Sequence, residues 1–252
     1  MLSLHELRAC RPRSVDPDYS RRVRRRKPPW IVQALLIAHK DLAIELATGE
    51  IVTTSGFFAV LVVIIASLSF YAGTDTTVRV APGVIWVAVA FASVLALGRT
   101  WQREREDGAL VGLLASPTAR SAIFAGKAMG VAAFIFLVEL IVVPVTALLF
   151  AVDLGRAGPG LLLFCVVATP GIASVGTLFG VMTVRTRARD LVLASVLFPL
   201  LAPSLLAAVA GTRELLGGAP FSELVDYIEL MAVFAFVFTA GGLGLFELLV
   251  EG

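Results

Sequence analysis

The stretch that decides the fold class is Ala128–Val152, which reads AMGVAAFIFLVELIVVPVTALLFAV. Its 25 positions hold one ionisable residue, Glu139, and a transmembrane helix needs about 20 predominantly apolar residues. Five other stretches are similarly apolar and poor in charge. The predicted transmembrane helices cover, in chain order, residues about 51–74, 80–98, 128–152, 160–184, 191–212 and 229–250. Because a chain in lipid must satisfy its backbone polar groups internally, this pattern predicts an all-α integral membrane protein with six spans.

The composition agrees with this class and excludes several others. Apolar residues make up 58% of the chain and charged residues 16%, against about 45–50% and about 25% in soluble domains. The net charge of +2 provides no general attraction for nucleic acid. Cys10 and Cys165 lie far apart, so neither a disulfide framework nor a zinc site is expected. The phosphate-binding loop of P-loop ATPases (Gly-x-x-x-x-Gly-Lys-Ser/Thr) does not occur.

The distribution of lysine and arginine predicts the orientation of the helices. Ten basic residues precede the first span, five lie between the second and third spans, and three lie between the fourth and fifth. The other segments between spans carry one each, at Arg79, Arg156 and Arg213. Loops rich in Lys and Arg stay on the cytoplasmic side. With an even number of spans, both termini are therefore expected in the cytoplasm.

Two segments precede the first span. Residues 1–29 are rich in arginine and show no apolar period, which predicts a disordered basic arm that binds anionic lipid. Over residues 30–48, apolar residues recur at helical spacing, with His39, Lys40 and Asp41 on the other side. This pattern predicts an amphipathic helix in the membrane interface. A docking face for a partner protein is an equally good interpretation of the same helix.

The loop between the second and third spans has the most informative sequence outside the membrane. Residues 99–108 (RTWQREREDG) continue the second span as a charged helix that Gly108 ends. Residues 109–115 (ALVGLLA) form a short apolar helix that Pro117 stops. Such a helix on a charged stalk buries its apolar side chains either in a groove of a partner protein or on the bilayer surface.

This loop resembles that of the CcmB family, also called haem exporter protein B. The matching motif is Glu104-Arg105-Glu106-Asp107-Gly108-Ala109-Leu110 with Leu113-Leu114-x-Ser116-Pro117. Further matches are Lys40-Asp41-Leu42 with Glu45-Leu46, Glu139 with Pro144, and Gly176-Thr177-Leu178-Phe179 with Arg185-Thr186-Arg187-Ala188-Arg189. The resemblance runs from about Trp30 to Gly252, and the basic arm departs from the family pattern.

The resemblance implies the permease subunit of an ABC-type complex in cytochrome c biogenesis, located in the inner membrane of a bacterium, with an ABC-2-exporter-like layout. A separate CcmA-like ATPase would hydrolyse ATP, and a CcmC-like haem-handling membrane protein and a CcmE-like haem chaperone would be further partners. The complex would either export haem or release the haem-loaded chaperone. The chain itself would then be a transport subunit and not an enzyme. Six spans are few for a complete pathway, which favours a homodimer.

The loop is also the expected contact with the ATPase, because work must enter through a cytoplasmic surface. The expected coupling residues are Glu104, Arg105, Glu106, Asp107, Gly108, Leu110, Leu113 and Leu114. Apolar anchors carry most of the energy of an interface, so the three leucines are expected to fill a groove of the ATPase. The stalk carboxylates are expected at the rim of the interface, where charges set orientation more than affinity.

Inside the spans, Glu139 is the candidate for a chemical role. A carboxyl group at this depth must face the protein interior or a water-filled path. Its expected partners are hydroxyls or the backbone carbonyl that Pro144 leaves unpaired one turn earlier. Glu139 is either a protonated group that fastens two helices or part of a gating or substrate path.

Prolines and glycines mark two further helices. Pro199 and Pro203 lie four residues apart in the fifth span and are candidate hinge residues. Gly176 and Gly180 in the fourth span have the spacing that lets two helices approach closely.

Haem ligands are not evident in the sequence. Both histidines, His5 and His39, precede the first span, and no Cys-x-x-Cys-His motif occurs. No directly bound cofactor is therefore predicted; haem would be cargo, and ATP would act through the partner subunit. One alternative is an ABC-2-type permease that exports a lipid, a glycan or a drug. A membrane-embedded enzyme would need several polar residues at one depth, and Glu139 stands alone.

Overall fold

The computed structural model describes residues 28–70, 74–106, 109–183 and 189–251, and within them not the side chains at 74–78, 106, 109–111, 183, 189–194 and 248–251. The predicted basic arm lies outside this description except for its last two residues. The described ranges contain helices and no strand. The helices are α2 Trp30–Thr48, α3 Glu50–Ser69, α4 Thr74–Glu106, α5 Ala109–Ala115, α6 Arg120–Leu149, α7 Leu154–Thr183, α8 Arg189–Gly217 and α9 Phe221–Glu251.

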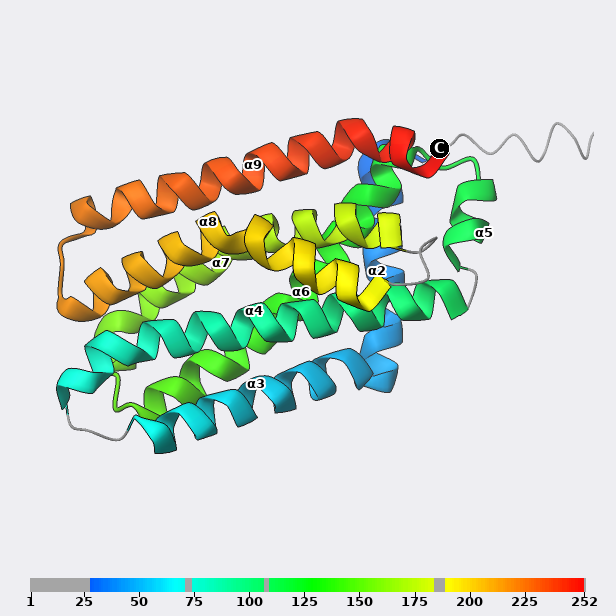
Figure 1. Ribbon diagram of the computed structural model, residues 1–252. Helices are drawn as coiled ribbons and strands as arrows, with labels where there is room; N and C mark the ends of the chain where they lie inside the picture. The colour runs from blue at the N-terminus through cyan, green and yellow to red at the C-terminus, as the bar shows by residue number, and fades with distance from the viewer. Residues whose placement is uncertain (1–27, 71–73, 107–108, 184–188, 252) are drawn as a thin grey trace, which may run out of the picture.

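Six of these helices are long and apolar enough to cross a membrane: α3, α4, α6, α7, α8 and α9. They lie alongside one another as a bundle, whereas α2 crosses one end of the bundle and α5 extends beyond that same end (Figure 1). The predicted all-α integral membrane fold is therefore confirmed. We call the end of the bundle that carries α2 and α5 the α2 end.

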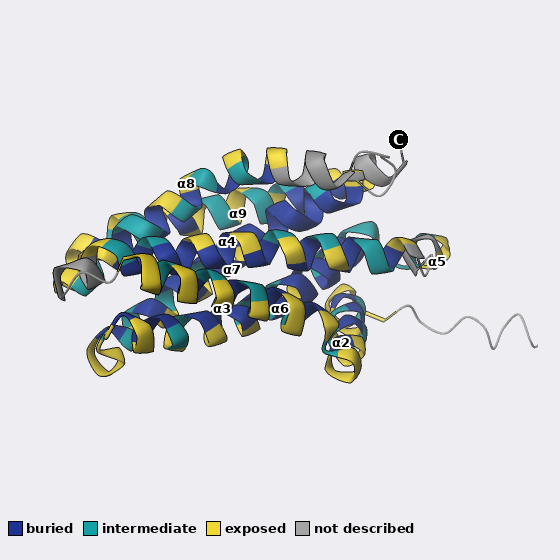
Figure 2. Cartoon of the chain, turned by 60° about the horizontal axis from the view of Figure 1, so that its bottom comes forward, coloured by how far each residue is buried: buried dark blue, intermediate teal, exposed yellow. Residues whose placement is uncertain are grey.

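The core is formed by all six spans, with α4 and α7 the most enclosed. Exposed residues follow the outer faces of the helices and buried ones face inward (Figure 2). Two pairs of polar side chains inside the bundle bond across helices, as buried polar groups prefer. The indole Nε1 of Trp86 in α4 donates to Thr212 Oγ1 of α8 at 2.9 Å. The hydroxyls of Ser174 in α7 and Thr239 in α9 lie 2.8 Å apart.

The prolines of the spans lie inside continuous helices. Pro144 is within α6, and both Pro199 and Pro203 are within α8, which runs unbroken from Arg189 to Gly217. The two α8 prolines therefore do not divide the fifth span into separate helices.

Two glycines let α4 and α7 approach each other closely. A Cβ added at Gly176 would overlap the side chain of Leu97, and one added at Gly180 would overlap the indole of Trp101. Both of these large side chains belong to α4 and are buried. The small residues of α7 therefore form the surface on which the last turns of α4 pack.

The connection between α2 and α3 is a single residue, Gly49. Its φ of +62° lies in the left-handed region, and its N–H donates to the carbonyl of Glu45 at 2.6 Å. Glycine adopts this conformation without a Cβ clash. The chain therefore turns sharply from the helix that crosses the bundle end into the first span.

The predicted helix over residues 30–48 has the bounds of α2, but the predicted orientation of Asp41 is wrong. Asp41 is buried against the bundle and not on an outward polar face. The buried residues of α2 are Ala34, Ile37, Asp41 and Glu45. The expected apolar face contains residues such as Ile31, which is 63% exposed. The face that packs against the bundle is therefore partly ionic, and apolar side chains point outward.

Candidate functional site

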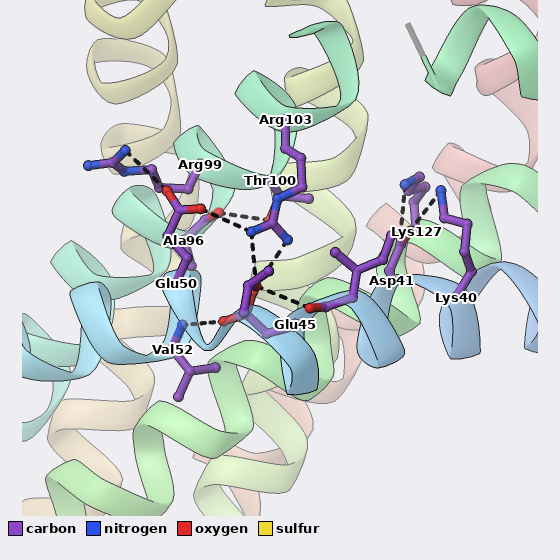
Figure 3. A network of polar contacts seen from close by, with 12 residues as sticks. Lys40, Asp41, Glu45, Glu50, Val52, Ala96, Arg99, Thr100, Arg103 and Lys127 are labelled. Carbon is purple, nitrogen blue, oxygen red and sulfur yellow. Dashed lines mark hydrogen bonds and ion pairs between the residues drawn. The ribbon is translucent and has the colours of Figure 1, made fainter. Parts of the chain in front are cut away.

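The α2 end contains two clusters of charged side chains drawn from four helices (Figure 3). The inner cluster consists of Lys40, Asp41, Glu104 and Lys127. The outer cluster consists of Glu45, Glu50, Arg99 and Arg103. Each cluster holds two cations and two carboxylates, so that its charges balance, as buried charges require.

Lys127 is the central residue of the inner cluster. It lies near the beginning of α6 and is only 1% exposed. Its Nζ donates to Asp41 Oδ2 of α2 at 2.7 Å and also pairs with Glu104 Oε1 of α4. Charge-assisted hydrogen bonds of this kind are about twice as strong as neutral ones. One side chain therefore links three helices.

The backbone geometry of α6 explains how α2 comes within reach of Lys127. A Cβ added at Gly126 would lie 2.7 Å from the carbonyl oxygen of Ala34 and 2.7 Å from Ile37 Cβ. A Cβ at Gly130 would lie 3.4 Å from Asp41 Cβ. The absence of side chains at these two positions lets α2 lie directly on α6, with Asp41 beside Lys127.

Lys40 is the second cation of the inner cluster and lies on the side of the cluster that faces solvent. Its Nζ lies 3.2 Å from Asp41 Oδ1 and 3.6 Å from Glu104 Oε1. Partial burial lowers the pKa of Lys40, but the charges of Asp41 and Glu104 outweigh this and raise the pKa above its usual value. Lys40 therefore stays charged and is a second cation for both carboxylates.

Glu104 does not have the exposed position expected of a rim charge. It is 6% exposed and points back into the bundle end toward Lys127. Its Oε2 has no hydrogen-bond partner among the described residues. It lines a cavity of about 60 Å³ together with Lys40, Asp41 and Arg103. Arg105 is exposed, whereas Asp107, Gly108 and the side chains of Glu106 and Leu110 lie outside the described part of the chain.

The outer cluster joins the start of α3 to the end of α4. Arg103 lies 3.5 Å from Glu45 Oε2 and 3.2 Å from Glu50 Oε2, and Arg99 lies 3.6 Å from Glu50 Oε1. Glu45 is buried and also accepts the backbone N–H of Val52 at 2.9 Å. Glu50 and Arg99 are exposed, and such surface pairs contribute about 0–1 kcal/mol.

The short helix α5 has the predicted bounds and packs back on its own chain. Leu113 and Leu114 are partly buried against a second core cluster that includes Trp101 and Phe124. Arg120 Nη1 donates to the carbonyl of Leu114 at 2.7 Å, which satisfies one of the free carbonyls at the end of α5. The two leucines therefore help to fix α5 to the bundle, and their contact with an ATPase groove stays a prediction.

The start of α6 is also tied to α2. Trp30 Nε1 donates to Ser121 Oγ at 2.9 Å, and the N–H of Ala119 donates to Gln33 Oε1 at 3.0 Å. Because α5 and α2 are both fixed to the first turn of α6, these three helices form one connected unit at the α2 end.

Lys127 is one of the five basic residues between the second and third spans, and it was not predicted to be a partner of Asp41 and Glu104. One signal was present: Lys127 is flanked by Gly126 and Gly130, a spacing at which helices approach closely. A charge beside such a contact has to be paired. The identity of its partners, on helices far away in sequence, was not accessible.

Glu139 lies apart from these clusters, between α6 and α7. It is 1% exposed, and Thr169 Oγ1 lies 2.7 Å from its Oε2 and also 2.7 Å from the carbonyl of Cys165. Because a hydroxyl has one proton to donate, a proton on the carboxyl group satisfies both contacts. Glu139 and Pro144 line a mostly apolar cavity of about 220 Å³. No group of three His, Cys, Asp or Glu side chains able to hold a metal ion is found in the described residues.

Comparison with known proteins identifies the family. Residues 32–240 match the model of the family described as CcmB protein. The chain is 27% identical to heme exporter protein B of Bradyrhizobium diazoefficiens, over 75% of this chain and 86% of the relative. It is 25% identical to heme exporter protein B of Pseudomonas aeruginosa, over 82% and 92%, and 29% identical to that of Paracoccus denitrificans, over 77% and 88%. The family match covers most of the chain, which therefore belongs to the CcmB family.

Proposed function

We propose that this chain is the permease subunit of an ABC transporter complex for cytochrome c biogenesis. A separate, CcmA-like ATPase subunit binds to α5 and hydrolyses ATP, and the spans use this work for haem export or for release of a haem-loaded chaperone. Membership of the CcmB family and the heme exporter relatives support the proposal. The observation that carries it is the position of α5, a short helix beyond the end of a span and fixed to the bundle.

The attachment of α5 makes it suitable for transmitting force. Leu113 and Leu114 pack against the core cluster that includes Trp101 of α4 and Phe124 of α6, and Arg120 of α6 donates to the end of α5. A flexible loop could move without displacing the spans, whereas a displacement of a helix attached to two spans also displaces those spans. Gly112 and Ala115 are exposed on α5 and are free to meet a partner.

The α2 end is then the cytoplasmic end. The described basic residues of this end include those of both ionic clusters, while Arg79, Arg156 and Arg213 lie at the other end of the spans. This distribution favours cytoplasmic termini, and the bacterial heme exporter relatives favour the inner membrane of a bacterium. A homodimer, a CcmC-like membrane protein and a CcmE-like chaperone complete the proposed complex.

The intramembrane residues have supporting roles in this proposal. Glu139 fastens α6 to α7 through Thr169. Pro199 and Pro203 remain candidate hinge residues of α8, because a proline removes a helical hydrogen bond and such breaks serve moving helices in transporters.

The proposed contact is tested on the exposed surface of α5. The variant Gly112→Arg with Ala115→Arg places two long cationic side chains where the ATPase is expected to bind. An added Cβ at Gly112 meets nothing within 4 Å, so the permease itself should fold normally. We expect the amount of ATPase that co-purifies with the detergent-solubilised permease to fall at least tenfold.

The matched control is Gly112→Ala, which adds one methyl group to the same open position and should retain the ATPase. A double arginine variant that still binds a full complement of ATPase would disprove the assigned contact. Covalent attachment of haem to c-type cytochromes, measured in cells that lack the chromosomal copy of this chain, tests the pathway. Normal attachment without the chain would instead favour an ABC-2-type permease for a lipid, glycan or drug.

A further inference from the structure

We infer that Lys127, Asp41 and Glu104 form an ionic link that makes the end of α4 move together with α2 and α6 when the ATPase acts. The inference rests on the proposed function and names residues through which α5 would drive the spans. None of the three is proposed to touch the ATPase or the cargo. They are positioning residues that connect α5 to the membrane-spanning helices.

Glu104 is placed where a movement of α5 must reach it. It lies in the last turn of α4, which ends at Glu106, and α5 begins at Ala109. A displacement of α5 therefore acts first on this turn. The Glu104 side chain is buried and directed at Lys127, so the displacement is passed inward.

Burial prevents the three helices from separating here. Lys127 is 1% exposed, and separation of the helices would take one or both carboxylates away from this buried cation, which is unfavourable. The contact of Gly126 with the α2 backbone adds a close steric fit at the same point. α2 therefore moves together with α6, and α4 moves with both of them through the contact of Glu104 with Lys127.

The link also has room to adjust. The cavity of about 60 Å³ beside Glu104 provides space for its carboxylate to shift. Lys40 lies 3.6 Å from Glu104 and can receive it as it turns away from Lys127. The carboxylate thus keeps a cationic partner during a small rotation of α4, which a fully packed apolar contact would resist.

The variant Glu104→Gln tests the link. Glutamine keeps an oxygen that accepts a hydrogen bond from Lys127 but loses the charge. We expect the complex to assemble with a full complement of ATPase and to hydrolyse ATP, while haem attachment to c-type cytochromes falls at least tenfold. The conservative variant Glu104→Asp keeps the negative charge facing Lys127 and Lys40 and should retain at least half of the native activity.

A distance measurement separates a linking role from a purely structural one. Spin labels at Arg105 and Leu46, which are exposed on α4 and α2, report whether the two helices move together in the ATPase complex. In the native chain we expect one narrow distance distribution both without nucleotide and with trapped ATP. In Glu104→Gln it should broaden when ATP is trapped.

The matched control is Glu50→Gln, which removes an exposed carboxylate at the same end and should leave the distance and cytochrome maturation unchanged. A native distance that shifts by several ångströms between the two states would overturn the inference, as would normal maturation by Glu104→Gln. Retention of the ATPase on Gly112→Arg with Ala115→Arg would instead refute the proposed contact, so the two failures are distinguishable.

Discussion

Replacement of Lys127 by methionine tests how much the inner cluster contributes to the free energy of unfolding. Methionine has a similar length and no charge, so the change leaves the side chains of Asp41 and Glu104, 9% and 7% exposed, without their shared cation. Removal of one partner from a buried ion pair costs about 3–5 kcal/mol. Because Lys40 still lies 3.2 Å from Asp41, we expect the lower end of this range, about 3 kcal/mol.

The expected change is large enough to measure by heating. In chains of about 150–250 residues, 1 kcal/mol shifts Tm by roughly 2–4 °C, so Lys127→Met should lower Tm by about 6–12 °C. The detergent-solubilised permease is heated, and the remaining monodisperse fraction is measured by size-exclusion chromatography. The control Arg99→Met removes a cation from an exposed pair at 3.6 Å and should cost less than about 1 kcal/mol.

A triple variant separates lost attraction from an unpaired buried charge. Lys127→Met combined with Asp41→Asn and Glu104→Gln removes all three charges and should recover most of the lost Tm, because neutral replacements of a buried ionic group are often tolerated. The reasoning is refuted if Lys127→Met melts within 2 °C of Arg99→Met, taking about 2 °C as the shift of 1 kcal/mol, or if the triple variant is as unstable as the single one.

Three further predictions concern orientation, the buried carboxyl group and pH. In a cysteine-free background, a cysteine at position 156 should react with an impermeant thiol reagent in intact cells and one at 105 should not; the reverse pattern would invert the topology. Glu139→Gln keeps an N–H that can donate to Thr169 Oγ1 and should assemble and function, whereas Glu139→Leu should lower the yield of folded complex; a well-assembled but inactive Gln variant would indicate a gating role. Lys40→Gln should lower the Tm of the permease by an amount that is constant below the ordinary pKa of 10.5 and declines as the pH rises above it, because a raised folded-state pKa stabilises only the protonated form; a difference that persists at higher pH would argue against the ion pairs as its cause.

Local composition was sufficient to predict the class of the protein and the position of its elements. A run of about 20 apolar residues has one stable arrangement in lipid, a helix. The predicted spans 80–98, 191–212 and 229–250 lie within α4, α8 and α9, and the other three overlap α3, α6 and α7 but extend past their ends. The ends of α2 and α5 also follow from local signals, because Gly49 adopts the left-handed conformation that ends α2 and Pro117 comes shortly after the end of α5. These properties depend on neighbours in the sequence and not on distant contacts.

The orientation of the charged side chains at the α2 end was decided only by tertiary structure. Asp41 follows Lys40 in a helix that reads as amphipathic, and Glu104 belongs to a run of alternating charges, so both looked exposed. They are buried because α2 crosses α6 at Gly126 and Lys127 lies under the crossing. Lys127 is 86 residues from Asp41 and 23 from Glu104. Helical periodicity identifies which residues share a face, but only the packing of the helices determines whether that face meets lipid, water or an opposite charge.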